Sequence, residues 1–185
     1  MDGGLLGGPP FFFLTSKRMA TKTLITEEDY LRTSFEGLDR EYCHGEVVER
    51  TMPTFLHGVV QGMLYALFLA YRKSHGLVPS TEARHKLGNG LIRIPDVAVR
   101  QGMPKKDCPD TPSYVAIEIL SPDDRMGDVT QKLREYRSFG VPHVWVVDPV
   151  SQELYVYDSD GLHQVRSLQI PEFGINFTPA QIFEE

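Results

Sequence analysis

The chain has 185 residues, a length that fits one domain better than two. Apolar residues make up 41% and charged residues 24%, the proportions of a globular protein with a substantial core. The formal net charge of −6 excludes a uniformly basic coat for nucleic acid, although a local basic groove stays open. The two cysteines, Cys43 and Cys108, lie far apart and outside any C-x-x-C, which excludes a disulfide scaffold and a cysteine-rich zinc module.

The first 18 residues differ in character from the rest. Asp2 stands where a signal peptide carries positive charge, and Pro9-Pro10 interrupts the apolar stretch. No apolar run approaches the roughly 18 residues needed to cross a bilayer. We expect residues 1–18 to be a flexible tail or the product of an upstream start, and residues 19–185 to form a single domain without a membrane partner, located in the cytoplasm.

The first half of the chain predicts two helices around a hairpin. A capping-box start at Thr26 predicts a helix over 26–34. A turn at His44-Gly45 predicts two short strands within 41–50. Apolar residues at helical spacing predict a long helix over 55–74 that ends at Gly76.

The second half predicts strands around one helix. Strand patterns occur at 77–82, 91–99, 113–120, 143–148 and 153–157. Gly88-Asn89-Gly90 is expected to be the turn between the first two of these strands. A helix is predicted over 127–139, a last hairpin at 158–161 and a helical turn at 178–183. The order is mixed α/β with hairpins at both ends.

Glu118 is the most informative residue of the sequence. It interrupts the apolar run Tyr114–Leu120, which is typical of a strand buried on both faces of a sheet. A carboxylate there is costly to ionise unless it is paired or bound to a metal. A salt bridge, or an edge strand with Glu118 facing water, is the structural alternative.

Asp96 is a second carboxylate among apolar neighbours. Strand alternation puts it on the same face as Ile92 and Ile94, although Pro95 leaves open that it is a turn residue. If the strands of Asp96 and Glu118 are neighbours, the two carboxylates meet and repel each other. A divalent cation resolves this conflict, since Mg²⁺ takes one or two protein carboxylates and keeps water on its other positions.

Lys132 is the third candidate. In the predicted helix it flanks the apolar stripe of Val129, Leu133 and Tyr136, so its ammonium can reach toward the sheet that carries Glu118. The structural alternative is a surface ion pair with Asp128, four residues earlier.

Asp96 after Pro95, followed by Glu118-Ile119-Leu120, resembles the signature of the PD-(D/E)XK nuclease superfamily. The chain departs from that signature because Leu120 stands in place of the lysine, and Lys132 resembles the migrated lysine of several branches. Further motifs of the series occur in order along the chain, on both sides of Asp96: Gly45-Glu46, His57, Ser121-Pro122, Asp128 with Leu133, Tyr136, Gly140-Val141-Pro142 and Trp145-Val146-Val147-Asp148-Pro149. The series resembles the bacterial "putative restriction endonuclease" domain family, long catalogued as a domain of unknown function, over roughly residues 24–183.

The resemblance implies a restriction-endonuclease-like α+β core, with a mixed central sheet flanked by helices and additional hairpins at both termini. It implies that Asp96 and Glu118 bind Mg²⁺ or Mn²⁺, with the Ile119 carbonyl as a further ligand. Lys132 would orient or help deprotonate the attacking water and stabilise charge on the phosphate. Glu46 resembles an additional acid that binds the metal directly or through water. His57 is either an accessory residue of the site or a structural residue bonded to backbone or to Glu46.

Basic residues bracket Asp96 in the sequence. Between Glu82 and Lys106 there are six basic and two acidic residues, and Arg125 lies near the other half of the expected site. We expect Arg84, Lys86, Arg93 and Arg125 to contact a DNA backbone without reading its sequence. A solvated charge run is the alternative. A homodimer is expected, because two cuts on a two-fold duplex suit a symmetric pair.

Together these residues predict a metal-dependent DNA endonuclease, a hydrolase acting on ester bonds. Two other classes of protein stay open. One is a catalytically idle nuclease-fold module that binds nucleic acid or a protein partner, and the other is an unrelated α/β protein whose acids are structural. The presence of Asp96, Glu118 and Lys132 together favours the enzyme.

Overall fold

The computed structural model describes residues 24–183, so the tail expected at residues 1–18 lies outside the described residues. The helices are α1 (Glu27–Arg32), α2 (Phe55–Leu69), α3 (Arg72–His75), α4 (Met126–Phe139), the 3₁₀ turn η1 (Pro171–Phe173) and α5 (Pro179–Phe183). The strands are β1 (Glu41–Cys43), β2 (Glu46–Val48), β3 (Leu77–Thr81), β4 (His85–Gly88), β5 (Leu91–Arg93), β6 (Val97–Gln101), β7 (Val115–Ile119), β8 (His143–Asp148), β9 (Glu153–Asp158), β10 (Gly161–Val165), β11 (Leu168–Ile170) and β12 (Ile175–Phe177).

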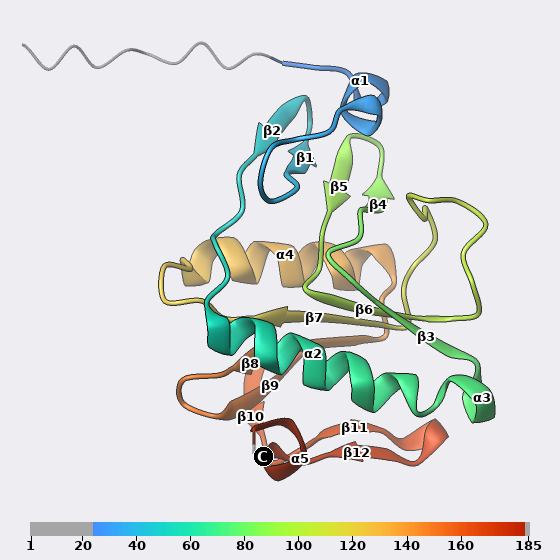
Figure 1. The fold of residues 1–185 in the computed structure, drawn as a ribbon, viewed down its shortest axis with the longest axis vertical. Helices are drawn as coiled ribbons and strands as arrows, with labels where there is room; N and C mark the ends of the chain where they lie inside the picture. The colour runs from blue at the N-terminus through green and yellow to red at the C-terminus, as the bar shows by residue number, and fades with distance from the viewer. Residues whose placement is uncertain (1–23, 184–185) are drawn as a thin grey trace, which may run out of the picture.

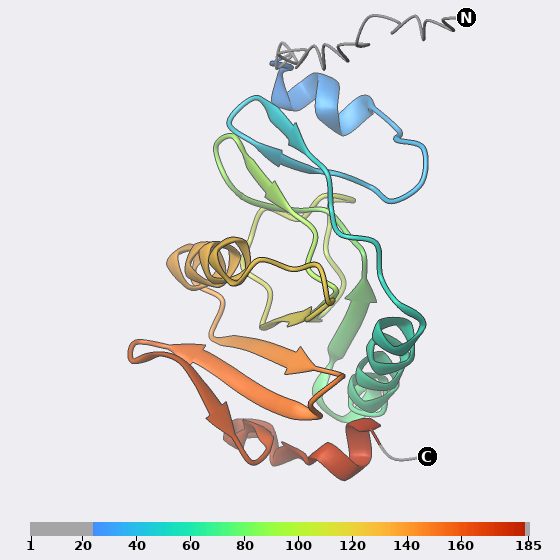
Figure 2. The same ribbon diagram turned by 90° about the vertical axis from the view of Figure 1, so that its left-hand side faces the viewer.

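A mixed central sheet forms the middle of the molecule (Figure 1). Its strand order is β10-β9-β8-β7-β6-β3, and β7 and β8 are its parallel pair. The helices α2 and α4 lie on opposite faces of this sheet (Figure 2). A smaller sheet, β2-β1-β5-β4, lies with α1 at one end of the molecule, and the β11-β12 hairpin lies at the other. The expected mixed sheet, flanking helices and terminal hairpins are confirmed.

The alternation of side chains along β7 determines which of its residues face α2 and which face α4. Ile117 and Ile119 point to α2 and pack in the larger core with Phe68. Ala116 packs with α4, and Glu118 also points to that side, where α4 supplies its hydrogen-bond partners. A strand buried on both faces therefore carries one carboxylate into the layer between sheet and helix.

The single strand expected over 91–99 was wrong. The chain forms β5 in the small sheet, crosses over Ile94-Pro95-Asp96, and continues as β6 in the central sheet. Pro95 lacks the N–H that a continuous strand would donate, which explains the break. The turn at 88–90 consequently joins β4 to β5, and β3 instead pairs antiparallel with β6.

Several short elements also differ from expectation. The helix expected over 55–74 is divided into α2 and α3 near Ala70 and Tyr71. The strand β4 and the hairpin of β11 and β12 were not expected, because strands of three or four residues carry little alternation. Within the described part of the chain, every helix is too short or too polar to cross a membrane.

Arg84 joins α1 to the small sheet. Its Nε and Nη2 donate to the two carboxylate oxygens of Asp39, both at 2.6 Å. Its remaining N–H groups donate to the carbonyls of Tyr30 and Thr33 at 3.2 and 3.0 Å, and the guanidinium lies 4.4 Å from the centre of the Tyr30 ring. The residue expected as a DNA contact is thus engaged within the protein.

We expect Arg84→Met to lower the free energy of unfolding by about 1–3 kcal/mol, because the change removes the donor to Asp39 Oδ2 and to the Thr33 carbonyl and weakens the bonding of Asp39 Oδ1 and the Tyr30 carbonyl. Urea denaturation followed by circular dichroism measures this. The matched control is Arg72→Met, which removes an exposed arginine. Unchanged stability with weakened DNA binding would instead support the phosphate contact that the sequence predicts.

Candidate active site

Asp96 and Glu118 meet at one end of the central sheet. The antiparallel register pairs Val97 with Ile117, so its continuation puts Asp96 opposite Glu118. The backbone N–H of Ile119 donates to Asp96 Oδ2 at 2.7 Å and fixes the carboxylate there. The segments that carry Asp96 and Glu118 are therefore neighbours, which is the condition for the two carboxylates to come close.

Lys132 points from α4 to the same place. Its Nζ lies 3.3 Å from Glu118 Oε2 and 3.1 Å from Glu41 Oε1. The hydroxyl of Tyr136, one turn along the helix, donates to Glu118 Oε1 at 2.6 Å. The ammonium therefore faces the buried acids across the helix–sheet interface.

Glu41 is a site residue that the sequence reasoning missed. It begins β1, is only 1% exposed, and accepts from Arg93 Nη1 at 2.8 Å and from the Ile94 N–H at 3.1 Å. The pairing of β1 with β5 brings it there, and no local pattern signals that pairing. Glu46, the acid expected from the resemblance, lies opposite Cys43 beside the hairpin turn and does not line the pocket described next.

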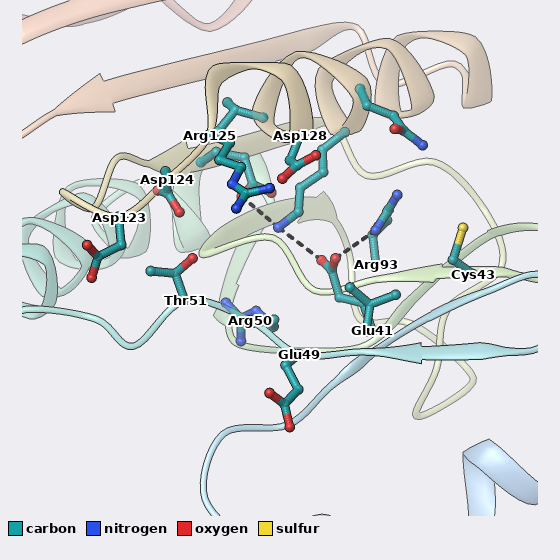
Figure 3. A pocket seen from close by; sticks show the side chains of 15 residues that line it. Glu41, Cys43, Glu49, Arg50, Thr51, Arg93, Asp123, Asp124, Arg125 and Asp128 are labelled. Carbon is teal, nitrogen blue, oxygen red and sulfur yellow. Dashed lines mark hydrogen bonds and ion pairs between the residues drawn. The ribbon is translucent and has the colours of Figure 1, made fainter. Parts of the chain in front are cut away.

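A pocket of about 370 Å³ opens beside Lys132 (Figure 3). It lies between the small sheet, the segment after β7 and the first turns of α4. Its lining residues are Glu41, Cys43, Val48, Glu49, Arg50, Thr51, Arg93, Glu118, Asp123, Asp124, Arg125, Asp128, Val129, Gln131 and Lys132. The six carboxylates outnumber the four basic groups, so the wall of the pocket is acidic.

Arg50 connects this pocket to Asp96 and was also missed. Its Nη2 donates to Asp96 Oδ1 at 3.1 Å, and its Nη1 forms an ion pair with Glu82. Gln61 of α2 donates to Glu82 Oε1 at 2.8 Å and to the Asp96 carbonyl at 2.9 Å. The guanidinium thus pairs with both carboxylates, and Gln61 links the Glu82 carboxylate to the backbone of Asp96.

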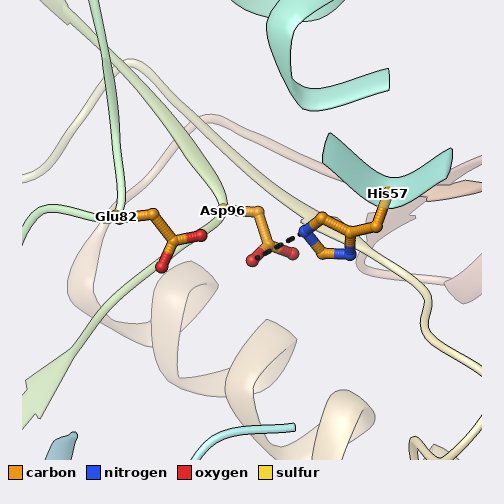
Figure 4. Close-up of side chains that lie close together, drawn as sticks. All are labelled: His57, Glu82 and Asp96. Carbon is orange, nitrogen blue, oxygen red and sulfur yellow. Dashed lines mark ion pairs between the residues drawn. The ribbon is translucent and has the colours of Figure 1, made fainter. Parts of the chain in front are cut away.

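His57 reaches Asp96 from the first turn of α2. The Thr54 hydroxyl caps this helix by accepting from the His57 N–H at 3.1 Å. The imidazole Nδ1 is 3.2 Å from Ser121 Oγ, whereas Nε2 is buried without a hydrogen bond and lies 3.5 Å from Asp96 Oδ1. Figure 4 shows Asp96 between His57 and Glu82, and one ligand atom from each lies within 4.8 Å of the others.

The contacts of Glu118 and Lys132 determine the charge that each side chain carries. The pKa of Glu118 is raised to about 7, chiefly by burial and also by the neighbouring Asp96 and Glu41, while the Lys132 ammonium opposes the rise. Burial acts to lower the pKa of Lys132, but Glu118 and Glu41 raise it above its ordinary value. Lys132 is therefore an ammonium at neutral pH, which suits stabilisation of negative charge better than acceptance of a proton.

The remaining expected DNA contacts lie in different settings. Lys86 forms an ion pair with Glu27, and Arg93 donates to Glu135 at 2.6 and 3.0 Å as well as to Glu41. Arg125 is exposed at the N-cap of α4 and lines the pocket. Of these three, Arg125 is the one whose side chain faces solvent.

Comparisons with known proteins agree with this geometry. The chain is similar to a protein from Anabaena variabilis ATCC 29413 described as "a putative nuclease belonging to DUF820", with 20% sequence identity and a TM-score of 0.75 over 86% of this chain and 97% of that chain. At this identity the likeness shows the fold, and the expected restriction-endonuclease-like core is confirmed. A search of curated proteins found no match.

The family is shown by the sequence itself. The profile of one family, described as "Putative restriction endonuclease", matches residues 27–185, which is nearly all of the chain that the structure describes and most of its length. The match agrees with the resemblance carried by Asp96, Glu118 and Lys132. The chain belongs to this family, Uma2.

Proposed function

We propose that this chain is a metal-dependent endonuclease that hydrolyses DNA phosphodiester bonds, with Asp96 and Glu118 holding Mg²⁺ or Mn²⁺ and Lys132 as the migrated lysine. The observation that supports this most is the convergence of the three residues from separate elements. Asp96 lies opposite Glu118, and the Lys132 ammonium is 3.3 Å from the latter. A structural salt bridge needs one acid and one base, whereas three buried acids gather here. They are Glu41, Asp96 and Glu118, and their basic partners are Lys132, Arg50 and Arg93.

The donor set fits a divalent cation. A carboxylate oxygen can accept from more than one partner. The contacts that Asp96 and Glu118 already make therefore leave lone pairs for a cation. A bound divalent cation would polarise a phosphoryl oxygen and make water more acidic. Glu118 has a raised pKa because it is buried near other acids, and a cation beside it would favour its charged form. The Ile119 carbonyl and Glu46 stay predicted further ligands.

Lys132 supplies a fixed positive charge. Glu41 and Glu118 hold its ammonium from two sides, and Tyr136 holds the second oxygen of Glu118. Charge that grows on a phosphate in the transition state is stabilised most by groups already in position. Glu41 is therefore a positioning residue for Lys132.

The substrate contact proposed for Arg125 rests on its position. It is exposed at the N-cap of α4, where the backbone N–H groups of the first turn also favour an anion. The acidic pocket repels a phosphate in the absence of a cation, so we expect weak, salt-sensitive binding of DNA. The contacts expected of Arg84, Lys86 and Arg93 find no support in their internal ion pairs. The cytoplasmic location stays a prediction.

We expect Asp96→Asn and Lys132→Met each to lower metal-dependent DNA cleavage at least about 100-fold, because one removes a ligand charge and the other a preorganised positive charge. Cleavage of plasmid, linear duplex and single-stranded DNA is measured with Mg²⁺, with Mn²⁺ and with EDTA.

Matched controls for this experiment are Asp107→Asn and Lys105→Met, which remove exposed charges. Equal cleavage by all five proteins would mean a contaminating nuclease or another site. A wild-type protein that binds DNA and does not cut it under any of these conditions would favour the idle binding module.

Glu118→Gln gives a prediction of pH dependence. The stabilising contribution of a protonated Glu118 is fully present below its ordinary pKa of 4.5 and is lost as the pH rises through about 7. In EDTA, we expect the variant to be more stable than wild type at about pH 8 by roughly 1–3 kcal/mol and similar at about pH 5. Chemical denaturation measures both values, with the exposed Glu36→Gln as control. A difference that does not vary with pH would contradict the burial argument.

A symmetric dimer also stays a prediction, and the outer face of α2 supports it. Phe55 is 90% exposed, and Leu56, Val59 and Leu69 are exposed as well. The helix contains no Asp, Glu, Lys or Arg, so this face suits packing against its own copy across a two-fold axis. Val59→Glu should shift sedimentation toward the monomer, whereas Val150→Glu, which changes an exposed turn, should not. A wild-type monomer at all concentrations would exclude the dimer.

A further inference from the structure

We propose that His57 Nε2, Glu82 and Asp96 form a second cation site that takes a divalent transition metal, and that the Arg50 guanidinium is its built-in competitor. The proposal rests on the proposed function only in sharing Asp96 with it. Glu118 lies on the α4 side of the sheet. The second cluster lies beside α2, which supplies its member His57 and the neighbouring Gln61.

The first observation is the position of the His57 Nε2, which has no hydrogen bond. The side chain is buried, and its Nε2 makes no hydrogen bond although it lies 3.5 Å from Asp96 Oδ1. This contact is an ion pair only when the imidazole is protonated. A neutral Nε2 has no hydrogen bond here, and a cation between the nitrogen and the carboxylate would compensate its burial. The nitrogen is aimed into the cluster by the capped first turn of α2, so its position does not depend on a flexible loop.

The second observation is the partner of the other ring nitrogen. His57 Nδ1 is 3.2 Å from Ser121 Oγ, and donation of its proton to that hydroxyl would leave the Nε2 lone pair facing Asp96. Histidines that bind metals are oriented in this way, with the second nitrogen held by an outer partner. One imidazole with two carboxylates suits Mn²⁺, Co²⁺ or Zn²⁺ better than Mg²⁺, which prefers an all-oxygen shell.

Arg50 would compete with the cation for the carboxylates of the cluster. Its guanidinium pairs with both Glu82 and Asp96, the same two carboxylates that the cation would use. Gln61 donates to the Glu82 side chain and to the Asp96 backbone carbonyl, and the Ile119 N–H donates to Asp96 Oδ2, so both carboxylates keep a hydrogen bond when Arg50 is displaced. Arg50 also lines the pocket, where a released guanidinium can bind a phosphate with its planar set of donors. Cation binding would therefore transfer a positive charge from the cluster to the pocket.

The experiment is a titration of the metal-stripped, full-length protein with Mn²⁺, with free Mn²⁺ followed by electron paramagnetic resonance. We expect His57→Gln and Glu82→Gln to weaken one class of site at least about tenfold, since loss of outer-shell partners alone costs about 10–100-fold. Arg50→Gln should strengthen the same class of site by a similar factor. Pulsed spectra should show nitrogen coupling in wild type that is absent from His57→Gln. His163→Gln and Glu36→Gln, which change exposed residues, are the matched controls.

The outcomes separate the second cation site from the proposed nuclease activity. If His57→Gln and Glu82→Gln bind Mn²⁺ as wild type does, the second site is wrong, while cleavage that depends on Asp96 and Glu118 would still support the nuclease. Loss of binding in both variants, beside a wild type that cuts no DNA, would support the site and count against the nuclease. Thermal denaturation without metal identifies any variant that fails to fold. In that case the Arg50→Gln variant is the test. A Mn²⁺ affinity that is unchanged or weaker than that of wild type would contradict competition by Arg50. Absence of Mn²⁺ binding by wild type overturns the site.

Discussion

The burial of carboxylates at one end of the central sheet is the constraint on which the rest of the structure depends. Glu41, Asp96 and Glu118 are all buried there, and an ionised acid in such a place is unstable without compensation. The compensating charges come from different segments, with Lys132 on α4 and Arg50 after β2. The charges that the proposed chemistry needs are therefore also the contacts that join the small sheet to the helix and the central sheet.

This double role limits which side chains can move. Glu41 binds both Arg93 and Lys132, and Arg93 in turn holds Glu135 of α4 by two hydrogen bonds. Removal of one partner from such a buried network leaves an uncompensated charge, at a cost of about 3–5 kcal/mol. Lys132 is thus rigidly placed, which suits a group that acts through its charge.

The sequence predicts the centre of the site because each step there is local. Strand alternation places Glu118 between sheet and helix, and the apolar stripe of α4 turns Lys132 toward it. Glu41 and Arg50 could not be predicted in this way, because their contacts depend on the pairing of β1 with β5 and on an ion pair across 46 residues. The basic stretch around Asp96 misled for the same reason: Arg93 is basic along the chain and neutralised in space.

In the proposed enzyme, the acidic wall of the pocket would make metal binding and DNA binding interdependent. Lys132 is proposed to act on the reacting phosphate, and Arg93 is held by Glu41 and Glu135. Arg125 and Arg50 are therefore the further basic groups of the wall that could meet a phosphate. Arg50 is itself engaged by Glu82 and Asp96 until another cation replaces it. A cation in that cluster would both reduce the negative charge and free a guanidinium, and by linkage a bound phosphate would strengthen cation binding equally. If the chain has the proposed function, occupancy of the cation sites would set its affinity for DNA, which is consistent with a net charge of −6.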